Sequence, residues 1–179
     1  MVKYIMTKLN YLVIFLLFIS TPILAKPPDE TPLQCLTKNI YFESRTQSIA
    51  GQLAVALVVM NRVRNSRFPS TICAVIYEGP HYESWKTKSI PGLSKKLRTY
   101  YPHRDRCQFS WYCDGKSDEL KEESAVDIAQ RLAWLVMNGH IFDFTENATH
   151  YHANYVTPVW AKKKIKIVQI DDHIFYRDK

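Results

Sequence analysis

One glutamate stands out among the residues whose chemistry could be catalytic. Glu43 follows Leu36 and Ile40 at helical spacing, so on a helix its carboxyl shares their apolar face. Burial and the negative end of the helix dipole both favour the protonated carboxyl there. A protonated carboxyl in a partly apolar cleft is what acid-catalysed cleavage of a glycosidic bond requires. The alternative is a surface glutamate, turned to solvent or paired with Arg45 or Arg62.

A second group of reactive side chains lies near the end of the sequence. On a strand, His150 and His152 point to the same face, and His173 could complete a zinc site of three histidines. Exported zinc peptidases with such a His-x-His pair also carry an upstream His followed seven positions later by Asp. No histidine of this sequence is followed by Asp at that distance. We therefore expect no metal and no cofactor, with a zinc amidase or peptidase as the alternative.

These candidates must be positioned by an α+β fold, with helices first and a small antiparallel sheet late. Helical spacing and capping residues predict helices over 33–45, 49–63 (capped by Ser48), 71–77 and 118–138 (capped by Ser117 and stopped by Gly139). Alternation predicts strands over 107–114, 149–156, 164–170 and 173–177. The basic segment 79–106 has no period, which is typical of a functional loop or an insertion.

The first residues have the layout of a secretory signal peptide. Lys3 and Lys8 precede the apolar run 11–19, and Ala25 is a small residue at a cleavage point. We expect a signal peptide over 1–25, a disordered Pro-rich leader over 26–32 and one catalytic domain over 33–179. An uncleaved anchor is the alternative; otherwise the exported chain has no membrane span. The expected location is the periplasm or cell envelope, or the medium after secretion.

Four cysteines follow the predicted signal peptide. An even count in an exported chain indicates two disulfides, and three connectivities are open. On an extended segment, Cys107 and Cys113 lie about 20 Å apart, too far for a bridge unless the chain turns. We therefore favour Cys73–Cys107 with Cys35–Cys113.

The 179 residues carry a formal net charge of +7, which suits an anionic partner. Export and the lack of a nucleic-acid-binding motif argue against DNA or RNA as that partner.

Several ordered motifs resemble the spore-cortex-lytic SleB/CwlJ cell wall hydrolase family. Cys35-Leu36 and the run from Asn39 to Arg45 look like the opening of that family. Further similarity lies in 51–56, 61–63, 68–73, 107–111, 113–115, 150–153, 158–160 and 173–176. The sequence departs from the family in Ser44-Arg45-Thr46, where a small Ala-Arg-Gly run is usual, and in a longer basic stretch over 80–106.

The resemblance implies a peptidoglycan-degrading domain with a lysozyme-like helical core, and it places the family's catalytic acid on Glu43. We expect a lytic transglycosylase that cleaves the β-1,4 bond between N-acetylmuramic acid and N-acetylglucosamine. The alternatives are the zinc enzyme above and a non-catalytic wall-binding protein. If the reaction were hydrolytic, Asp114 would be the candidate second carboxyl. The expected sugar-binding residues are Gln108, Ser110, Tyr151 and His152 through hydrogen bonds, and Trp111 and Trp160 through stacking.

Overall fold

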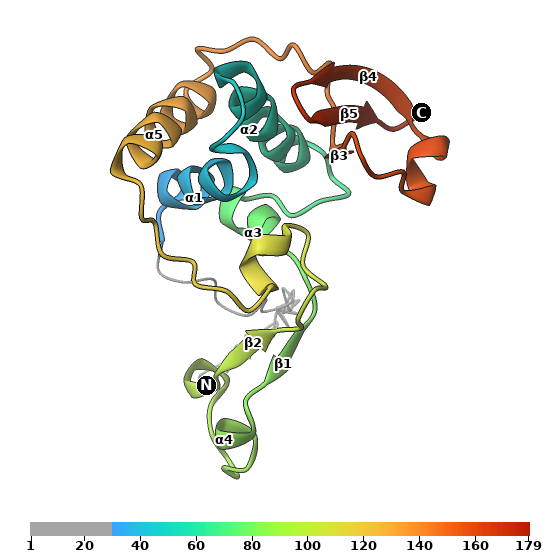
Figure 1. Cartoon of the computed structure of the whole chain (residues 1–179). Helices are drawn as coiled ribbons and strands as arrows, with labels where there is room; N and C mark the ends of the chain where they lie inside the picture. Colours follow the sequence, from blue (N-terminus) through green and yellow to red (C-terminus); the bar gives the residue numbers. More distant parts are fainter. Residues whose placement is uncertain (1–29) are drawn as a thin grey trace, which may run out of the picture.

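The computed structural model describes residues 30–179 and combines helices with small antiparallel sheets, as predicted. Figure 1 shows a helical body beside a three-stranded sheet, with a hairpin arm that projects away from both. The helices of the body are α1 (Pro32–Ser44), α2 (Ile49–Arg64), α3 (Ile72–Ile76) and α5 (Glu123–Met137). The predicted signal peptide, residues 1–25, lies outside the described residues. In the part of the chain from residue 30 onward, no helix has both the length and the apolar character to cross a bilayer.

Helix α1 begins with a capping box. The Thr31 hydroxyl accepts a hydrogen bond from the Gln34 N–H at 3.3 Å, and the Gln34 side chain accepts one from the Thr31 N–H at 2.8 Å. Thr31 and Pro32 therefore belong to the cap and the first turn, and the predicted leader ends too late. Leu36 and Ile40 are fully buried, which confirms the apolar stripe that leads to Glu43.

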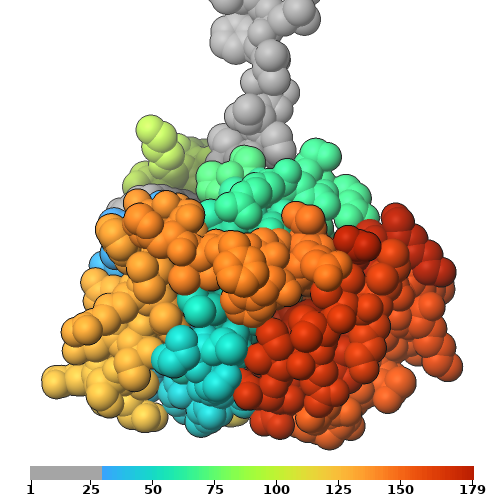
Figure 2. All heavy atoms as spheres, turned by 90° about the horizontal axis from the view of Figure 1, so that it is seen from above, coloured from blue at the N-terminus to red at the C-terminus, as the bar shows by residue number. Residues whose placement is uncertain are grey.

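Helix α2 is the central helix of the core. The Ser48 hydroxyl accepts from the Gly51 N–H at 3.2 Å, which confirms the predicted cap. Buried side chains lie all around the helix, as an uninterrupted apolar sequence predicts. On one side, Ala54 and Val58 pack against Phe175 of the sheet. Figure 2 shows the segment between α5 and the sheet crossing over α2.

Helix α5 begins five residues later than predicted. Its N-terminal cap position is Glu122 and not Ser117. The residues before the helix instead run along α1, where the Lys121 N–H donates to the Tyr41 hydroxyl at 3.4 Å. Tertiary contacts here override a local capping signal. At the other end Gly139 has φ +73°, which confirms the predicted stop.

The C-terminal sheet has the order β3 (His150–Ala153), β5 (His173–Arg177), β4 (Ile165–Ile170), and all pairs are antiparallel. The three predicted strands are confirmed, although β3 ends three residues before its predicted end. Tyr151 lies opposite Phe175, and His152 lies opposite Ile174. Because alternate residues face opposite sides, Tyr151 and His152 point to different faces of the sheet.

The irregular basic segment forms the projecting arm, residues 81–102. Strands β1 (His81–Glu83) and β2 (Tyr100–Pro102) pair in antiparallel fashion at its base. Between them lie the short helix α4 (Trp85–Lys88) and the 3-10 turn η1 (Lys95–Leu97). The arm extends away from the side of the body that carries α2, α5 and the C-terminal sheet (Figure 1).

The predicted disulfide pairing is wrong. The structure joins Cys35 to Cys73 and Cys107 to Cys113, with Cα–Cα distances of 5.4 and 6.1 Å. The first bridge ties α1 to α3. The second forms because the segment predicted as a strand is instead a 3-10 helix, η2 (Ser110–Cys113), which turns the chain back on itself. Because the chain turns at η2, Cys107 and Cys113 come close enough to form a bridge, which they could not do on an extended segment.

Candidate active site

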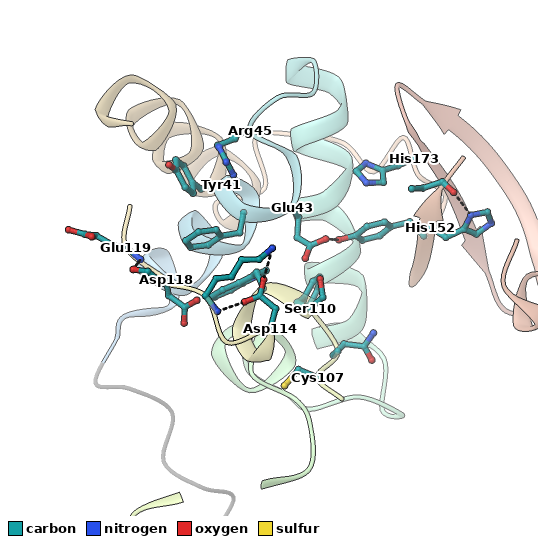
Figure 3. A pocket seen from close by; sticks show the side chains of 18 of the residues that line it. Tyr41, Glu43, Arg45, Cys107, Ser110, Asp114, Asp118, Glu119, His152 and His173 are labelled. Carbon is teal, nitrogen blue, oxygen red and sulfur yellow. Dashed lines mark hydrogen bonds and ion pairs between the residues drawn. The ribbon is translucent and has the colours of Figure 1, made fainter. Parts of the chain in front are cut away.

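A cleft of about 890 Å³ opens between α1, η2 and the C-terminal sheet (Figure 3). Its walls also take in the segment before α5, from Lys116 to Glu122. Most of the site residues expected from the sequence line this cleft: Glu43, Gln108, Ser110, Trp111, Asp114 and Tyr151. His152 also borders it, but its ring points to the other face of the sheet from Tyr151 and bonds to the Tyr176 hydroxyl at 3.0 Å.

Glu43 projects from the last turn of α1 toward the sheet (Figure 3). The hydroxyl of Tyr151 donates a hydrogen bond to its Oε2 at 2.8 Å. Burial raises the pKa of Glu43, while the Tyr151 hydrogen bond and the positive charge of Arg62 act in the opposite direction. Desolvation is the largest of these effects, so the direction of the pKa shift agrees with the expectation. Arg45 pairs with Glu122 at 3.2 Å and leaves Glu43 without that partner.

Arg62 is a buried cation beside this carboxyl, with only 3% of its surface exposed. Its Nε donates to the carbonyl of Thr149 at 2.7 Å, and both of its terminal nitrogens lie 3.1 Å from the Gln108 side-chain oxygen when that amide faces the guanidinium. The guanidinium also lies over the rings of Phe68 and Phe109, at 5.4 and 5.2 Å. Burial lowers the pKa of Arg62, but a guanidinium remains charged at any physiological pH. The sequence analysis considered Arg62 only as a partner that could pair with Glu43 on the surface, and did not predict its burial.

Trp111 forms part of the cleft floor. Its Nε1–H donates to Asn39 Oδ1 at 3.1 Å, and its ring stacks on Phe42 at 4.8 Å between centroids. Only 6% of its surface is exposed. The ring therefore supports the cleft by packing, and Phe42, half-buried on the cleft wall, is an aromatic contact that the sequence analysis missed.

Asp114 lies in the cleft but is engaged elsewhere. Its carboxylate accepts a hydrogen bond from the Lys116 N–H at 2.8 Å and lies 3.6 Å from the Lys116 ammonium (Figure 3). Asp118, in the segment before α5, is a second carboxyl that the sequence analysis did not single out. Burial raises the pKa of Asp118. The sequence analysis missed Asp118 because it placed this residue in the first turn of a helix capped by Ser117, whereas α5 begins only at Glu123.

The histidines of the C-terminal sheet and the aromatic side chains beside them lie on two different faces of that sheet. Tyr151 and His173 share the face toward the cleft interior, with ring centroids 5.0 Å apart. His150 and His152 share the other face, where both lie 5.5 Å from the ring of Trp160. Trp160 therefore packs behind the cleft and does not line it.

The same arrangement separates the three histidines of the alternative zinc site. His173 lies on the opposite face of the sheet from His150 and His152, so the three rings do not converge. Over residues 30–179, no group of three or more metal-ligating side chains is placed to hold an ion. Burial lowers the pKa of His150 to about 4 and also lowers that of His173.

The chain is similar in sequence to a known protein family and to several spore cortex-lytic enzymes. Residues 46–176 match the sequence profile of the Cell Wall Hydrolase family, and Glu43 lies three residues before the matched segment. A spore cortex-lytic enzyme of Halalkalibacterium halodurans is 35% identical over 148 residues, which is 82% of this chain and 35% of that protein. A spore cortex-lytic enzyme of Bacillus cereus is 41% identical over 50 residues, 28% of this chain and 19% of that protein. The chain thus spans about a third or less of the length of these relatives.

Two solved structures share the fold. The catalytic domain of Bacillus cereus SleB superposes with a TM-score of 0.56 at 27% identity, covering 82% of this chain and 89% of the other. The catalytic domain of the germination-specific lytic transglycosylase SleB from Bacillus anthracis gives a TM-score of 0.57 at 26% identity, covering 85% and 100%. The predicted family resemblance and fold class are confirmed.

Proposed function

The chain belongs to the Cell Wall Hydrolase family, and from that premise we propose that it is a lytic transglycosylase with Glu43 as its single catalytic carboxyl. The substrate is the glycan of peptidoglycan, and the bond cleaved is the β-1,4 bond between N-acetylmuramic acid and N-acetylglucosamine. The observation that carries the proposal is a carboxyl with a raised pKa, hydrogen-bonded to Tyr151, in a cleft of about 890 Å³.

In the first step, Glu43 gives its proton to the glycosidic oxygen as the bond from that oxygen to C1 of N-acetylmuramic acid breaks. In the second step, the Glu43 carboxylate removes the proton from the C6 hydroxyl of the same sugar, and the C6 oxygen bonds to C1. The product ends in 1,6-anhydro-N-acetylmuramic acid, and Glu43 is protonated again. One residue therefore serves as acid and then as base.

Tyr151 and Arg62 suit the state between these two steps. A carboxylate that has just lost its proton in a buried site is destabilised by desolvation. The Tyr151 hydroxyl donates to Glu43 at 2.8 Å, and the positive charge of Arg62 favours the ionised form. Both groups thus stabilise the ionised form of Glu43, while burial still leaves the pKa of this carboxyl raised.

The engagement of Asp114 argues against this residue as the second carboxyl of a hydrolytic enzyme. A hydrolytic enzyme uses a second carboxyl to activate water or to form a covalent intermediate. Asp114 is the candidate from the sequence, and its carboxylate is held by the backbone and side chain of Lys116. An intramolecular attack by the sugar's own hydroxyl needs no such second group.

The relatives support the substrate class. The matched curated proteins are described as spore cortex-lytic enzymes, and one matched structure is described as a lytic transglycosylase. The signal-peptide layout of residues 1–25 and the paired cysteines support export, and we propose the periplasm or cell envelope as the location.

Digestion of purified sacculi, followed by mass spectrometry of the soluble products, tests the proposal. We expect 1,6-anhydro ends with the wild-type enzyme, their loss with Glu43→Gln, and their persistence with Asp114→Asn. Reducing muramic acid ends that disappear with Asp114→Asn would replace transglycosylation with hydrolysis. Cleaved peptide stems on intact glycan chains would overturn the glycan-cleaving activity itself.

A further inference from the structure

The outer end of the arm exposes large apolar side chains. We call residues 84–99 the arm tip; it contains α4 and η1. Trp85, Ile90 and Leu97 are exposed by 75, 47 and 67%, respectively. Single exposed apolar residues are common on protein surfaces, whereas exposed apolar side chains that gather in one place mark interaction sites.

The arm tip is also strongly basic. Its four exposed lysines are Lys86, Lys88, Lys95 and Lys96, and Lys86 lies 5.9 Å from the Trp85 ring. The sequence from 84 to 99 contains no Asp or Glu. Glu83, just before it, is paired with Arg98 at 2.6 Å, so no carboxylate near the tip offsets the lysines.

We propose that the arm tip docks on the surface of an anionic phospholipid bilayer. Trp prefers the boundary between lipid headgroups and acyl chains, and exposed Ile and Leu side chains gain free energy by entering that boundary. Lysines beside them are attracted to anionic headgroups. The tip offers both features together, and the expected export of the chain would bring it to a membrane face.

The composition of the tip favours lipid over glycan. Between residues 84 and 99 there is no carboxylate or amide side chain, and the polar side chains are hydroxyls, four lysines and one arginine. The tip is a projection and not a hollow, and the cleft takes no residue from it (Figure 1). Docking through the tip would therefore leave the cleft open to its substrate.

The base of the arm holds the tip in a defined direction. The two chain segments at the base are joined by hydrogen bonds from the His103 N–H to the Pro80 carbonyl at 2.9 Å and from the Gln108 N–H to the Glu78 carbonyl at 2.8 Å. The Cys107–Cys113 bridge then fixes the returning segment to η2. Lipid docking would orient the whole body relative to the bilayer. This inference is independent of the reaction catalysed in the cleft.

Vesicle sedimentation with residues 26–179 tests the proposal, because this form retains all described residues and lacks the apolar run of the signal peptide, which would itself bind lipid. The probes are vesicles of phosphatidylglycerol with phosphatidylethanolamine and vesicles of phosphatidylcholine alone. We expect binding only to the anionic vesicles, weakened by salt, with a blue shift of the Trp85 emission that Trp85→Phe removes.

Matched variants locate the binding surface. We expect Lys86→Gln with Lys88→Gln to weaken vesicle binding about tenfold or more, and Trp85→Ser with Leu97→Ser to do the same. The controls are Lys162→Gln with Lys163→Gln, and Trp134→Ser, which remove exposed lysines or an exposed indole elsewhere and should bind as the wild type does. All variants should cleave soluble glycan fragments at the wild-type rate.

Three results would overturn the inference: equal binding to phosphatidylcholine vesicles, vesicle binding that survives both tip variants, and no binding to either kind of vesicle. If the tip variants instead lose affinity for intact sacculi, the arm binds wall polymer and not lipid. Vesicle binding is measured separately from glycan cleavage. Failure of the lipid-docking proposal can therefore be distinguished from failure of the transglycosylase proposal.

Discussion

The hydroxyl of Tyr151 lies 2.8 Å from the carboxyl of Glu43, although the two residues are 108 positions apart in the chain. This single contact joins the last turn of α1 to the first strand of the C-terminal sheet. Burial raises the pKa of Glu43, and the hydrogen bond from the Tyr151 hydroxyl opposes that rise. The reactivity of the cleft therefore depends on how the sheet is placed against the helices.

The first prediction concerns the proton donor. Glu43→Gln keeps the size and most hydrogen bonds of the side chain but cannot deliver a proton. We expect cleavage of sacculi to fall roughly 10²–10⁴-fold while binding and the circular dichroism spectrum stay unchanged. Glu119→Gln is the matched control, because Glu119 is an exposed carboxyl of the same cleft. Full activity of Glu43→Gln would exclude Glu43 as the acid.

The second prediction concerns pH dependence. Activity should fall as pH rises through the pKa of Glu43, because the acid must be protonated. The Tyr151 hydrogen bond lowers that pKa, so Tyr151→Phe should move the alkaline limb of the kcat/KM profile to higher pH. Tyr155→Phe, at an exposed position in the same cleft, should leave the limb in place. A shift to lower pH would contradict the assigned role of Tyr151.

The third prediction concerns stability. Because the folded state raises the pKa of Glu43 above 4.5, the native protein holds that proton more tightly than the unfolded chain does, and stability is lost as pH rises through this range. Glu43→Gln removes the loss. We therefore expect the variant to have a higher Tm than the wild type at pH 7, by about 2–4 °C for each kcal/mol gained.

The difference in Tm should shrink as pH falls toward 4.5 and vanish below it, where the carboxyl is protonated in both states. Comparing the two proteins at each pH cancels the titration of other groups, including the half-buried His150. A constant difference across pH would mean that the substitution acts by packing and not by charge.

The fourth prediction concerns the disulfides. By the entropy of loop closure, Cys35–Cys73, with a separation of 38 residues, should contribute about 4 kcal/mol, and Cys107–Cys113, with a separation of 6, about 2 kcal/mol. Denaturation of the two double Cys→Ala variants measures this order. The second variant should also lose activity, because its bridge fixes the turn that carries Trp111. Peptide mapping without reduction would disprove the pairing if it found Cys73 linked to Cys107.

Local sequence signals predicted the helices and the position of Glu43 on its stripe, because helical spacing and capping residues act over a few neighbours. They failed where distant contacts decide the outcome. Ser117 carries a capping signal, but contacts of the following residues with α1 delay the start of α5. Cys107 and Cys113 meet only because their segment forms a 3-10 turn and not the expected strand.

The candidate site shows the same division. Types and spacing indicated Glu43, and the family resemblance indicated most of its neighbours in the cleft. Neither indicated that Arg62 is a buried cation held by Thr149 and Gln108, because that position depends on three separate segments meeting. Trp160 was expected to stack on sugar, but the alternation of β3 puts its partners His150 and His152 on the far face.

The base of the arm has one further consequence. A Cβ built on Gly79 would lie 3.1 Å from the Cα of Cys107, so the chain leaves the body and returns to it at nearly the same point. The arm tip, residues 84–99, could therefore be shortened, lengthened or exchanged without moving Gln108 or η2, whereas His81 and Asp105 nearer the base bond to Tyr112 and Cys113 of η2. If the arm tip docks on lipid as proposed, the docking surface and the cleft can be altered independently, in evolution or by grafting a new hairpin.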